Sequence, residues 1–282
     1  MAKKISTVLI IFSCLLIGNS CKDKKDDDTP TPEEEFDRAA MLSNLANNII
    51  VPAYTELKLK TDTFDIARTN FVSAPDSANL VALRNAFGEL YKTWQSCSVF
   101  EFGQAEVELL RASLNTFPTD TVQINSNIAS GTYDLASVAN IDAKGLPAID
   151  FLLFKNNISN TVYSFTAGTN ATNRKTYLTD IGNEVKTKIV NVFNSWNTSY
   201  VSTFSSNTGT NIGSSVGQLV NQINFDLELL KNAKIGIPLG KKTLDIPVPE
   251  KTEAYYKGNS AELAKLNLKN LENVFLGKDA LG

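Results

Sequence analysis

The stretch LVALRNAFGELYKTWQSC, residues 80–97, carries the most regular hydrophobic pattern in the chain. Its apolar residues recur at alternating intervals of three and four positions, at Leu80, Leu83, Phe87, Leu90, Trp94 and Cys97. This spacing places them on one face of an α-helix, because such a helix turns once every ~3.6 residues. Asp76 or Ser77, which follow Pro75, suit the N-cap. The stretch therefore predicts an amphipathic helix with Trp94 in the core.

Similar stripes cover much of the remaining chain. The N-terminal one comprises Leu42, Leu45, Ile49, Pro52, Leu57, Phe64, Ala67 and Phe71. Pro52 should kink or break that helix, because proline lacks the backbone N–H. Three further stripes cover residues 178–200, 212–230 and 263–275. Since few segments alternate with a period of two, the sequence predicts an all-α fold.

The ends of these helices carry recognisable signals. Residues 259–262 (Asn-Ser-Ala-Glu) are typical of a capping box before the last helix. Lys231, Lys234 and Gly236 suit the C-terminus of the helix before them. Pro147 suits the first turn of a helix over residues 148–154. The connections are expected at residues 117–120, 144–147 and 235–250.

Composition excludes several classes of function. The chain has 282 residues, 43% of them hydrophobic, which is enough to bury a core without disulfides or structural metals. It contains no histidine, which excludes Ser-His-Asp catalysis, HExxH zinc sites and haem ligation by imidazole. The net charge is −3 and no basic block occurs, so we expect no nucleic-acid partner.

The N-terminus has the features of a lipoprotein signal peptide, predicted over residues 1–20. Lys3 and Lys4 form a short basic region, and the apolar run of residues 5–17 is too short to cross a bilayer. The run ends in Gly-Asn-Ser before Cys21, which resembles a lipobox, so Cys21 is the expected site of lipidation. The alternative is an ordinary signal peptide with an incidental cysteine. Once Cys21 is acylated, Cys97 has no partner for a disulfide.

Residues 21–33 are rich in lysine, aspartate and proline and cannot form a core, so they predict an extended tether. The acidic run directly after Cys21 also resembles the signal that sends lipoproteins of Bacteroidetes-type bacteria to the outer face of the outer membrane. We therefore expect an outer-membrane lipid anchor, on the periplasmic face or at the cell surface.

Four short blocks follow one another along the body of the chain: WQSC at 94–97 with FEFGQAE at 100–106, GLPAIDFLLF at 145–154, KIGIPLG at 234–240, and EAYYKGNS at 253–260. Together they resemble the imelysin-like family, also called the M75 peptidase or iron-regulated protein A family. The resemblance implies two helical bundles packed side by side with a pocket near their junction. We expect the bundles at 34–156 and 157–282, the second incomplete relative to the family and with apolar helix faces exposed.

The family signature is GxHxxE, in which an imidazole and a carboxylate one helical turn apart can hold a metal ion. Here residues 145–150 read Gly-Leu-Pro-Ala-Ile-Asp, so Pro147 replaces the histidine and Asp150 replaces the glutamate. A single carboxylate cannot replace that pair for a transition metal. We therefore expect no catalytic residue, no metal ligand and no cofactor bound through this motif, and no peptidase activity.

The residues expected to line a ligand pocket at the junction are Gly145, Pro147, Asp150, Glu106, Tyr255 and Tyr256. The two tyrosines offer apolar walls with one hydroxyl each, and a phenolate can ligate ferric iron or haem. Structural roles remain open for the others. Asp150 suits the start of a helix, Gly145 suits a turn with positive φ, and Glu106 suits a solvated helix surface.

Three functions remain open at this point. The first is a lipid-anchored binding or accessory protein in iron or haem acquisition, which the family resemblance implies. The second is a surface lipoprotein that has lost the ancestral site and docks a partner such as an outer-membrane transporter. The third is an M75-type peptidase, for which the sequence offers no catalytic group. In the first two, acylated Cys21 makes the lipid bilayer a partner.

Overall fold

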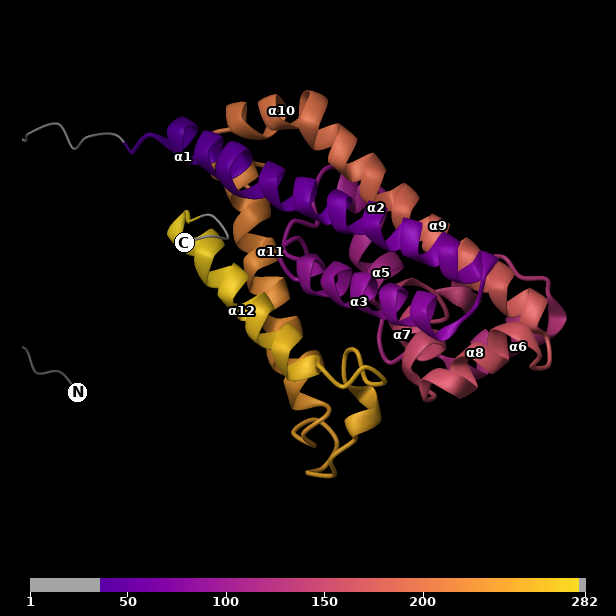
Figure 1. The fold of residues 1–282 in the computed structure, drawn as a ribbon. Coiled ribbons are helices and arrows are strands. Elements are labelled where there is room, and N and C mark those ends of the chain that lie inside the picture. Colours follow the sequence, from indigo (N-terminus) through magenta and orange to yellow (C-terminus); the bar gives the residue numbers. More distant parts are fainter. Residues whose placement is uncertain (1–35, 279–282) are drawn as a thin grey trace, which may run out of the picture. The chain divides into compact units, whose positions relative to one another are not determined.

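The computed structural model describes residues 36–278, and every regular element in that range is a helix (Figure 1). This confirms the predicted all-α fold. The predictions on the signal peptide, on Cys21 and on the tether lie outside the described residues. None of the helices between residues 36 and 278 is both long and apolar enough to cross a membrane.

Three long helices form the centre of the first part of the fold. These are α2 (Val51–Ser73), α3 (Ser77–Trp94) and α9 (Ala171–Ser195), and α2 packs against both of the others (Figure 1). The predicted apolar stripe of α3 is confirmed, because its five residues within the helix are fully buried: Leu80, Leu83, Phe87, Leu90 and Trp94. Asp76 is the N-cap and accepts a 2.7 Å hydrogen bond from the backbone N–H of Asn79.

The N-terminal stripe is not broken at Pro52 but continues through a π-helical segment that the sequence did not predict. A short α1 (Arg38–Asn44) leads into the π-helical segment η1 (Leu45–Ile50), which leads into α2. Pro52 lies in the first turn of α2. The backbone N–H of Val51 bonds Ala46 O, five residues back, so the wider turn accommodates a proline that donates no hydrogen bond.

Short helices fill the space between α3 and α9. They are α4 (Gln104–Val107), α5 (Leu110–Asn115), α6 (Thr121–Ser130), α7 (Gly145–Phe154) and α8 (Ile158–Thr166). α7 packs against α5 and α9, and its residues from Gly145 to Leu153 are all buried. The helix begins at Gly145, three residues before the predicted start, so Pro147 lies in its first turn as expected.

The C-terminal part continues from α9 through η3 (Trp196–Tyr200) and α10 (Val201–Ser206) to α11 (Ser215–Leu229), η4 (Leu230–Gly236), the short turn η5 (Pro249–Lys251) and α12 (Ser260–Leu276). α12 packs against α11, η4 and α3. The predicted reciprocal capping box is absent at α12. The side chain of Asn259 donates to the Glu262 carboxylate at 3.2 Å and caps no backbone N–H.

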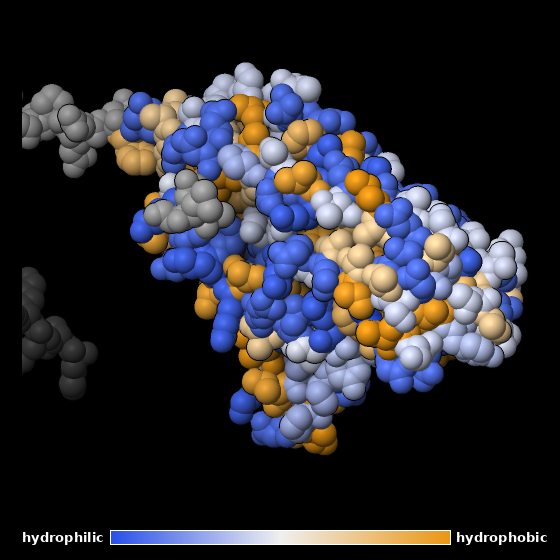
Figure 2. All heavy atoms as spheres, in the orientation of Figure 1, coloured by the Kyte–Doolittle hydropathy of each residue, from blue (hydrophilic) through white to orange (hydrophobic). Residues whose placement is uncertain are grey.

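The proposed boundary between residues 156 and 157 stays a prediction. α9 lies beyond that boundary and packs along α2, and its stripe from Leu178 to Trp196 is buried. The stripe predicted over residues 212–230 is only partly buried, because Ile212 is 83% and Leu227 43% exposed. Figure 2 shows hydrophobic residues interspersed among hydrophilic ones on the face it displays.

Candidate functional site

Four of the six predicted pocket residues line one pocket: Pro147, Asp150, Tyr255 and Tyr256. Its remaining lining comes from residues 117–119, Glu250, Thr252 and Ala254. The pocket contains about 280 Å³ of space, its open mouth included. Most of that space is the open mouth, because the enclosed part measures only about 20 Å³, room for about one water molecule and far below the ~300–1,000 Å³ that is usual for drug-sized ligands. The pocket therefore suits a small group rather than a large molecule.

Asp150 projects from α7 and is 1% exposed. Its two carboxylate oxygens accept hydrogen bonds from the backbone N–H groups of Tyr256 at 2.9 Å and Lys257 at 3.0 Å. Burial raises the pKa of Asp150 to about 7, although these two hydrogen bonds and the charge of Lys257 oppose that shift. Asp150 thus fastens the segment before α12 onto α7.

The structure places Gly145 and Glu106 away from this pocket. Gly145 has φ of 71°, and a Cβ there would lie 2.5 Å from the backbone oxygen of Leu114, so both the turn and the close approach require glycine. Glu106 lies on the exposed side of α4, whose buried side carries Ala105. Neither residue lines the pocket.

The two tyrosines differ in exposure. Tyr255 is 45% exposed, whereas the ring of Tyr256 packs edge-on against Phe151 with centroids 5.2 Å apart. Burial raises the pKa of Tyr256, and neighbouring Tyr255 and Asp150 act in the same direction. Tyr256 is therefore a neutral phenol at physiological pH, which can donate or accept one hydrogen bond.

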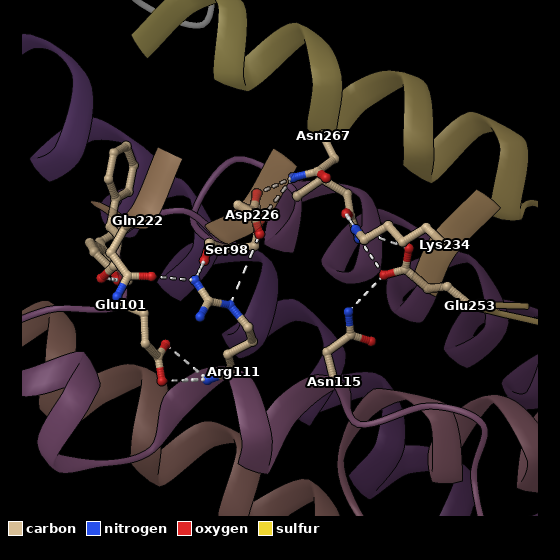
Figure 3. A network of polar contacts seen from close by, with 12 residues as sticks. Ser98, Glu101, Arg111, Asn115, Gln222, Asp226, Lys234, Glu253 and Asn267 are labelled. Carbon is tan, nitrogen blue, oxygen red and sulfur yellow. Dashed lines mark hydrogen bonds and ion pairs between the residues drawn. The ribbon is translucent and has the colours of Figure 1, made fainter. Parts of the chain in front are cut away.

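A buried polar network lies near this pocket, between residues 91–115 and the C-terminal helices (Figure 3). We call its first part the Arg111 cluster, comprising Ser98, Glu101, Arg111, Gln222, Asp226 and Asn267. Asp226 is fully buried, and its Oδ2 accepts from Ser98 Oγ at 3.1 Å and Asn267 Nδ2 at 2.7 Å. Arg111 donates to Gln222 Oε1 at 2.9 Å.

One edge of the Arg111 cluster is unsatisfied. Arg111 Nε and Asp226 Oδ1 lie 4.0 Å apart, beyond hydrogen-bond distance, and both atoms are buried without a hydrogen-bond partner among the described residues. The guanidinium also lies over the Phe225 ring, 4.7 Å from its centroid. The attraction between the Arg111 guanidinium and the Asp226 carboxylate is strengthened because water is excluded around Asp226.

Glu101 stabilises the same cluster through the backbone of Arg111. Both of its oxygens accept hydrogen bonds from the backbone N–H of Arg111, at 3.1 and 3.0 Å, which satisfies a donor at the start of α5. Burial raises the pKa of Glu101 to about 7, with the positive charge of Arg111 opposing and the negative charges of Glu106 and Asp226 adding to the shift. Near neutral pH this carboxyl is therefore partly protonated.

The second part of the network is the Lys234 cluster, which consists of Tyr91, Gln95, Asn115, Lys234 and Glu253. Lys234 Nζ lies 3.1 Å from Glu253 Oε2 and donates to Gln95 Oε1 at 2.6 Å. Glu253 Oε1 accepts from Gln95 Nε2 at 2.9 Å and Asn115 Nδ2 at 2.7 Å. Both charged side chains are at most 2% exposed, so this is a fully buried ion pair.

Lys234 lies in the last turn of η4, at the helix end where the sequence predicts it. The structure adds that its side chain points into the interior toward Glu253. The other residues of the network were not named individually from the sequence, although Gln95, Glu101 and Glu253 lie in the blocks quoted above. A signal did exist, because Asp226 and Asn267 interrupt the apolar stripes of α11 and α12.

The blocks that carried the family resemblance meet in this region. Gln95 and Glu101 come from the first block, Asp150 from the second, Lys234 from the third and Glu253 from the fourth. Each of these side chains is hydrogen-bonded to another part of the chain. Among residues 36–278, no group of three Cys, Asp or Glu side chains is close enough to hold a metal ion.

Comparison with known proteins agrees with this arrangement. The family model of imelysin, peptidase M75, matches residues 50–282. "Iron-regulated protein A" of Synechococcus elongatus is 26% identical over 113 residues, and the match spans 40% of this chain and 31% of the relative.

Two solved structures share the fold. One is a "putative iron-regulated protein A precursor" from Parabacteroides distasonis, with a TM-score of 0.70 and 19% identity over 86% of this chain and 74% of that one. The other is an imelysin-like protein from Psychrobacter arcticum, with a TM-score of 0.61 and 19% identity over 84% of this chain and 73% of that one. With the family model covering most of the chain and the fold in agreement, this protein belongs to the imelysin family.

Proposed function

We propose that this imelysin-family chain is a lipid-anchored binding component of iron or haem acquisition and has no peptidase activity. The observation that carries the proposal is the position of Asp150. Both oxygens of the one carboxylate kept from the family motif accept backbone N–H groups, so Asp150 holds the fold together.

The residues of the motif do not fit the metal that the family signature implies. Proline at position 147 has no side-chain donor, and the lone pairs of Asp150 that face Tyr256 and Lys257 are engaged. A hydrolase also needs a free general base, and both oxygens of Asp150 already accept backbone N–H groups. Binding without catalysis is the function that this pocket supports best.

The link to iron rests on the relatives. Two of the similar proteins carry the name iron-regulated protein A. The polar groups at the mouth of the pocket are the phenols of Tyr255 and Tyr256, the hydroxyls of Thr119 and Thr252, and the carboxylate of Glu250. Such groups hydrogen-bond an oxygen-rich ligand surface, for example an iron chelate or the edge of haem.

The location of the protein follows from Cys21. A tether of 13 residues, 21–33, spans up to about 45 Å when extended, which is enough to hold the folded part clear of the membrane. One test is Cys21→Ser in full-length protein expressed in its native type of host. We expect the variant to lose incorporation of labelled palmitate and to move from the membrane to the soluble fraction. Unchanged membrane association would contradict the anchor.

The binding test uses protein that starts at residue 34, purified without a histidine tag. Bound metals are measured by mass spectrometry, and ferric iron and haem are titrated into wild type and Tyr255→Phe. Tyr163→Phe is the matched control, because Tyr163 is an exposed tyrosine on α8, at 60% exposure. We expect binding that weakens in Tyr255→Phe and persists in Tyr163→Phe.

A peptide-library assay with the same protein tests the absence of peptidase activity. We expect no cleavage above that of a heat-denatured sample. Reproducible turnover that disappears in Asp150→Asn would contradict the proposal and would favour the M75 peptidase function.

A second candidate function is docking to a partner such as an outer-membrane transporter. The observation that favours it is the exposure of apolar side chains on the C-terminal helices: Phe225 is 52%, Leu268 52% and Phe275 78% exposed. Surface crosslinking in cells tests this function. A transporter adduct that is lost in Leu268→Ser and Phe275→Ser would support docking, whereas iron or haem binding by the isolated protein would favour the first function.

A further inference from the structure

A second hollow of the surface lies between α3 and the turn that precedes α12. Its lining consists of Arg84, Asn85, Gly88, Glu89, Lys92 and Lys257, and it contains about 480 Å³ of space, open side included. We call it the basic groove. It is distinct from the Asp150 pocket, with which it shares no lining residue.

Two of the three basic residues have no acidic partner among the described residues. Arg84 is held by neutral oxygens, since its Nε donates to Leu153 O at 2.8 Å and its Nη2 donates to Asn156 O at 2.9 Å. Among the described residues, Lys257 forms no ion pair within 4 Å, and its charge reaches Asp150 and Glu262 only at longer range. Only Lys92 is paired, with Glu262 at 2.9 Å and Glu89 at 3.5 Å.

The two unpaired cations line the same groove and contact the same aromatic ring. Arg84 Cζ is 4.9 Å and Lys257 Nζ is 5.2 Å from the centroid of Phe154. The ring attracts both charges but neutralises neither of them. An anion in the groove would be attracted by both, in a protein whose overall charge is −3.

The nearest acidic groups do not neutralise this pair. Asp150 lies behind the backbone of Lys257, is bonded to backbone N–H groups, and has a pKa raised to about 7 by burial. Glu89 and Glu262 are turned to Lys92, and both side chains are about half exposed to water, at 58% and 48%. Water screens their effect on the groove.

Glycine at position 88 keeps the groove open. A Cβ at this position would lie 3.1 Å from Lys257 Cε and 3.4 Å from its Nζ, which is closer than a relaxed contact. Glycine in the middle of a helix costs about 1 kcal/mol relative to alanine. Here it allows the Lys257 side chain to lie across α3.

From these observations we propose that the basic groove is a binding site for a small polyanion, whose carboxylate or phosphate groups are held by Arg84, Lys92 and Lys257. Both kinds of group accept several charge-assisted hydrogen bonds from such donors, and Arg84 is already fixed in position by its backbone partners. The site shares no lining residue with the Asp150 pocket and needs no iron.

The test is isothermal titration calorimetry at low salt with two metal-free probes, citrate and inorganic phosphate. We expect at least one of them to bind with a submillimolar Kd. Lys257→Gln removes one charge but keeps the backbone N–H that bonds Asp150. It should weaken binding about tenfold, which corresponds to about 1.4 kcal/mol. Lys231→Gln is the matched control, because Lys231 is an exposed lysine on η4, and it should bind like wild type.

A second variant, Gly88→Ala, changes no charge. Because alanine favours the helix, the fold should be at least as stable, while the added methyl group displaces Lys257 and weakens binding. A lower Kd for phosphate than for citrate would identify phosphate as the preferred group, and a lower Kd for citrate would identify carboxylate. The proposal is overturned if neither probe binds at about 10 mM, or if both variants bind like wild type.

Discussion

The ion pair between Lys234 and Glu253 offers the sharpest test of the buried network. We consider Lys234→Met, Glu253→Gln and the double variant, in protein that starts at residue 34. Lys234→Met keeps the volume and the apolar stem of the side chain but removes its charge. Glu253 then stays buried, at 1% exposure, with only the neutral donors of Gln95 and Asn115.

Removing one partner of a buried pair typically costs about 3–5 kcal/mol, because the other charge stays buried without compensation. Glu253 keeps two short hydrogen bonds, at 2.9 and 2.7 Å, which places Lys234→Met at the low end, about 3 kcal/mol. Glu253→Gln should cost a similar amount. In the double variant no charge is left buried, so we expect a loss about 2–3 kcal/mol smaller than the sum.

The assay is urea unfolding followed by circular dichroism at 222 nm, which reports the loss of helix. A destabilisation of about 3 kcal/mol should also lower the melting temperature by about 6–12 °C in a domain of this size. Lys231→Met is the control, because the Lys231–Glu228 pair is exposed, and it should change stability by less than about 0.5 kcal/mol.

Two results would refute this reasoning. One is a cost below about 1 kcal/mol for Lys234→Met, since a buried uncompensated carboxylate cannot be tolerated so easily. The other is strict additivity of the two single variants, which would mean that Lys234 and Glu253 do not interact in the folded protein.

Three further predictions concern Asp150, Glu101 and Gly145. Asp150 keeps its proton up to about pH 7 in the folded state but loses it near pH 4 in the unfolded state. Between these values the folded state binds more protons than the unfolded state. The free energy of unfolding therefore falls as the pH rises, by up to about 1.4 kcal/mol per pH unit. The raised pKa of Glu101 acts in the same direction, so urea unfolding in Glu101→Gln should depend less steeply on pH than in wild type. Asp150→Asn removes one of two acceptors for backbone N–H groups and should cost about 2 kcal/mol of stability at neutral pH. The melting temperature should fall by about 4–8 °C. An unchanged melting temperature would disprove the bridging role. Gly145→Ala places a Cβ 2.5 Å from Leu114 O at a φ of 71° and should cost at least about 2 kcal/mol of stability. The variant should give a low soluble yield. Wild-type yield and stability would contradict the close packing at this position.

The helices could be predicted from the sequence because the apolar residues that they bury recur with the period of an α-helix. The stripe of α3 and the cap at Asp76 depend only on residues a few positions apart. The π-helical turn before Pro52 could not be predicted, because it depends on how α1, α2 and α10 pack together. The reciprocal capping box before α12 failed for a related reason: the side chains of Asn259 and Glu262 bond each other.

The candidate site was predicted only in part, for a physical reason. The motif and the tyrosines drew attention to Asp150, Tyr255 and Tyr256, and these residues do line one pocket. Partners such as Arg111 and Asp226 come from distant segments, and a lone polar residue within an apolar stripe does not reveal which residue it meets. Only the packing of α11 and α12 on the first part of the fold brings them together.

The same network has a consequence for the order in which the chain folds. Gln95 and Glu253 are 158 residues apart, and Ser98 and Asn267 are 169 apart. As the chain emerges N-terminus first, the early partners are therefore exposed before the late ones arrive. A polar surface can wait in water without sticking to other nascent chains, whereas an apolar surface of the same size would promote aggregation. Because part of the surface that waits is polar, we expect the half that emerges first to aggregate less than it would with a wholly apolar junction.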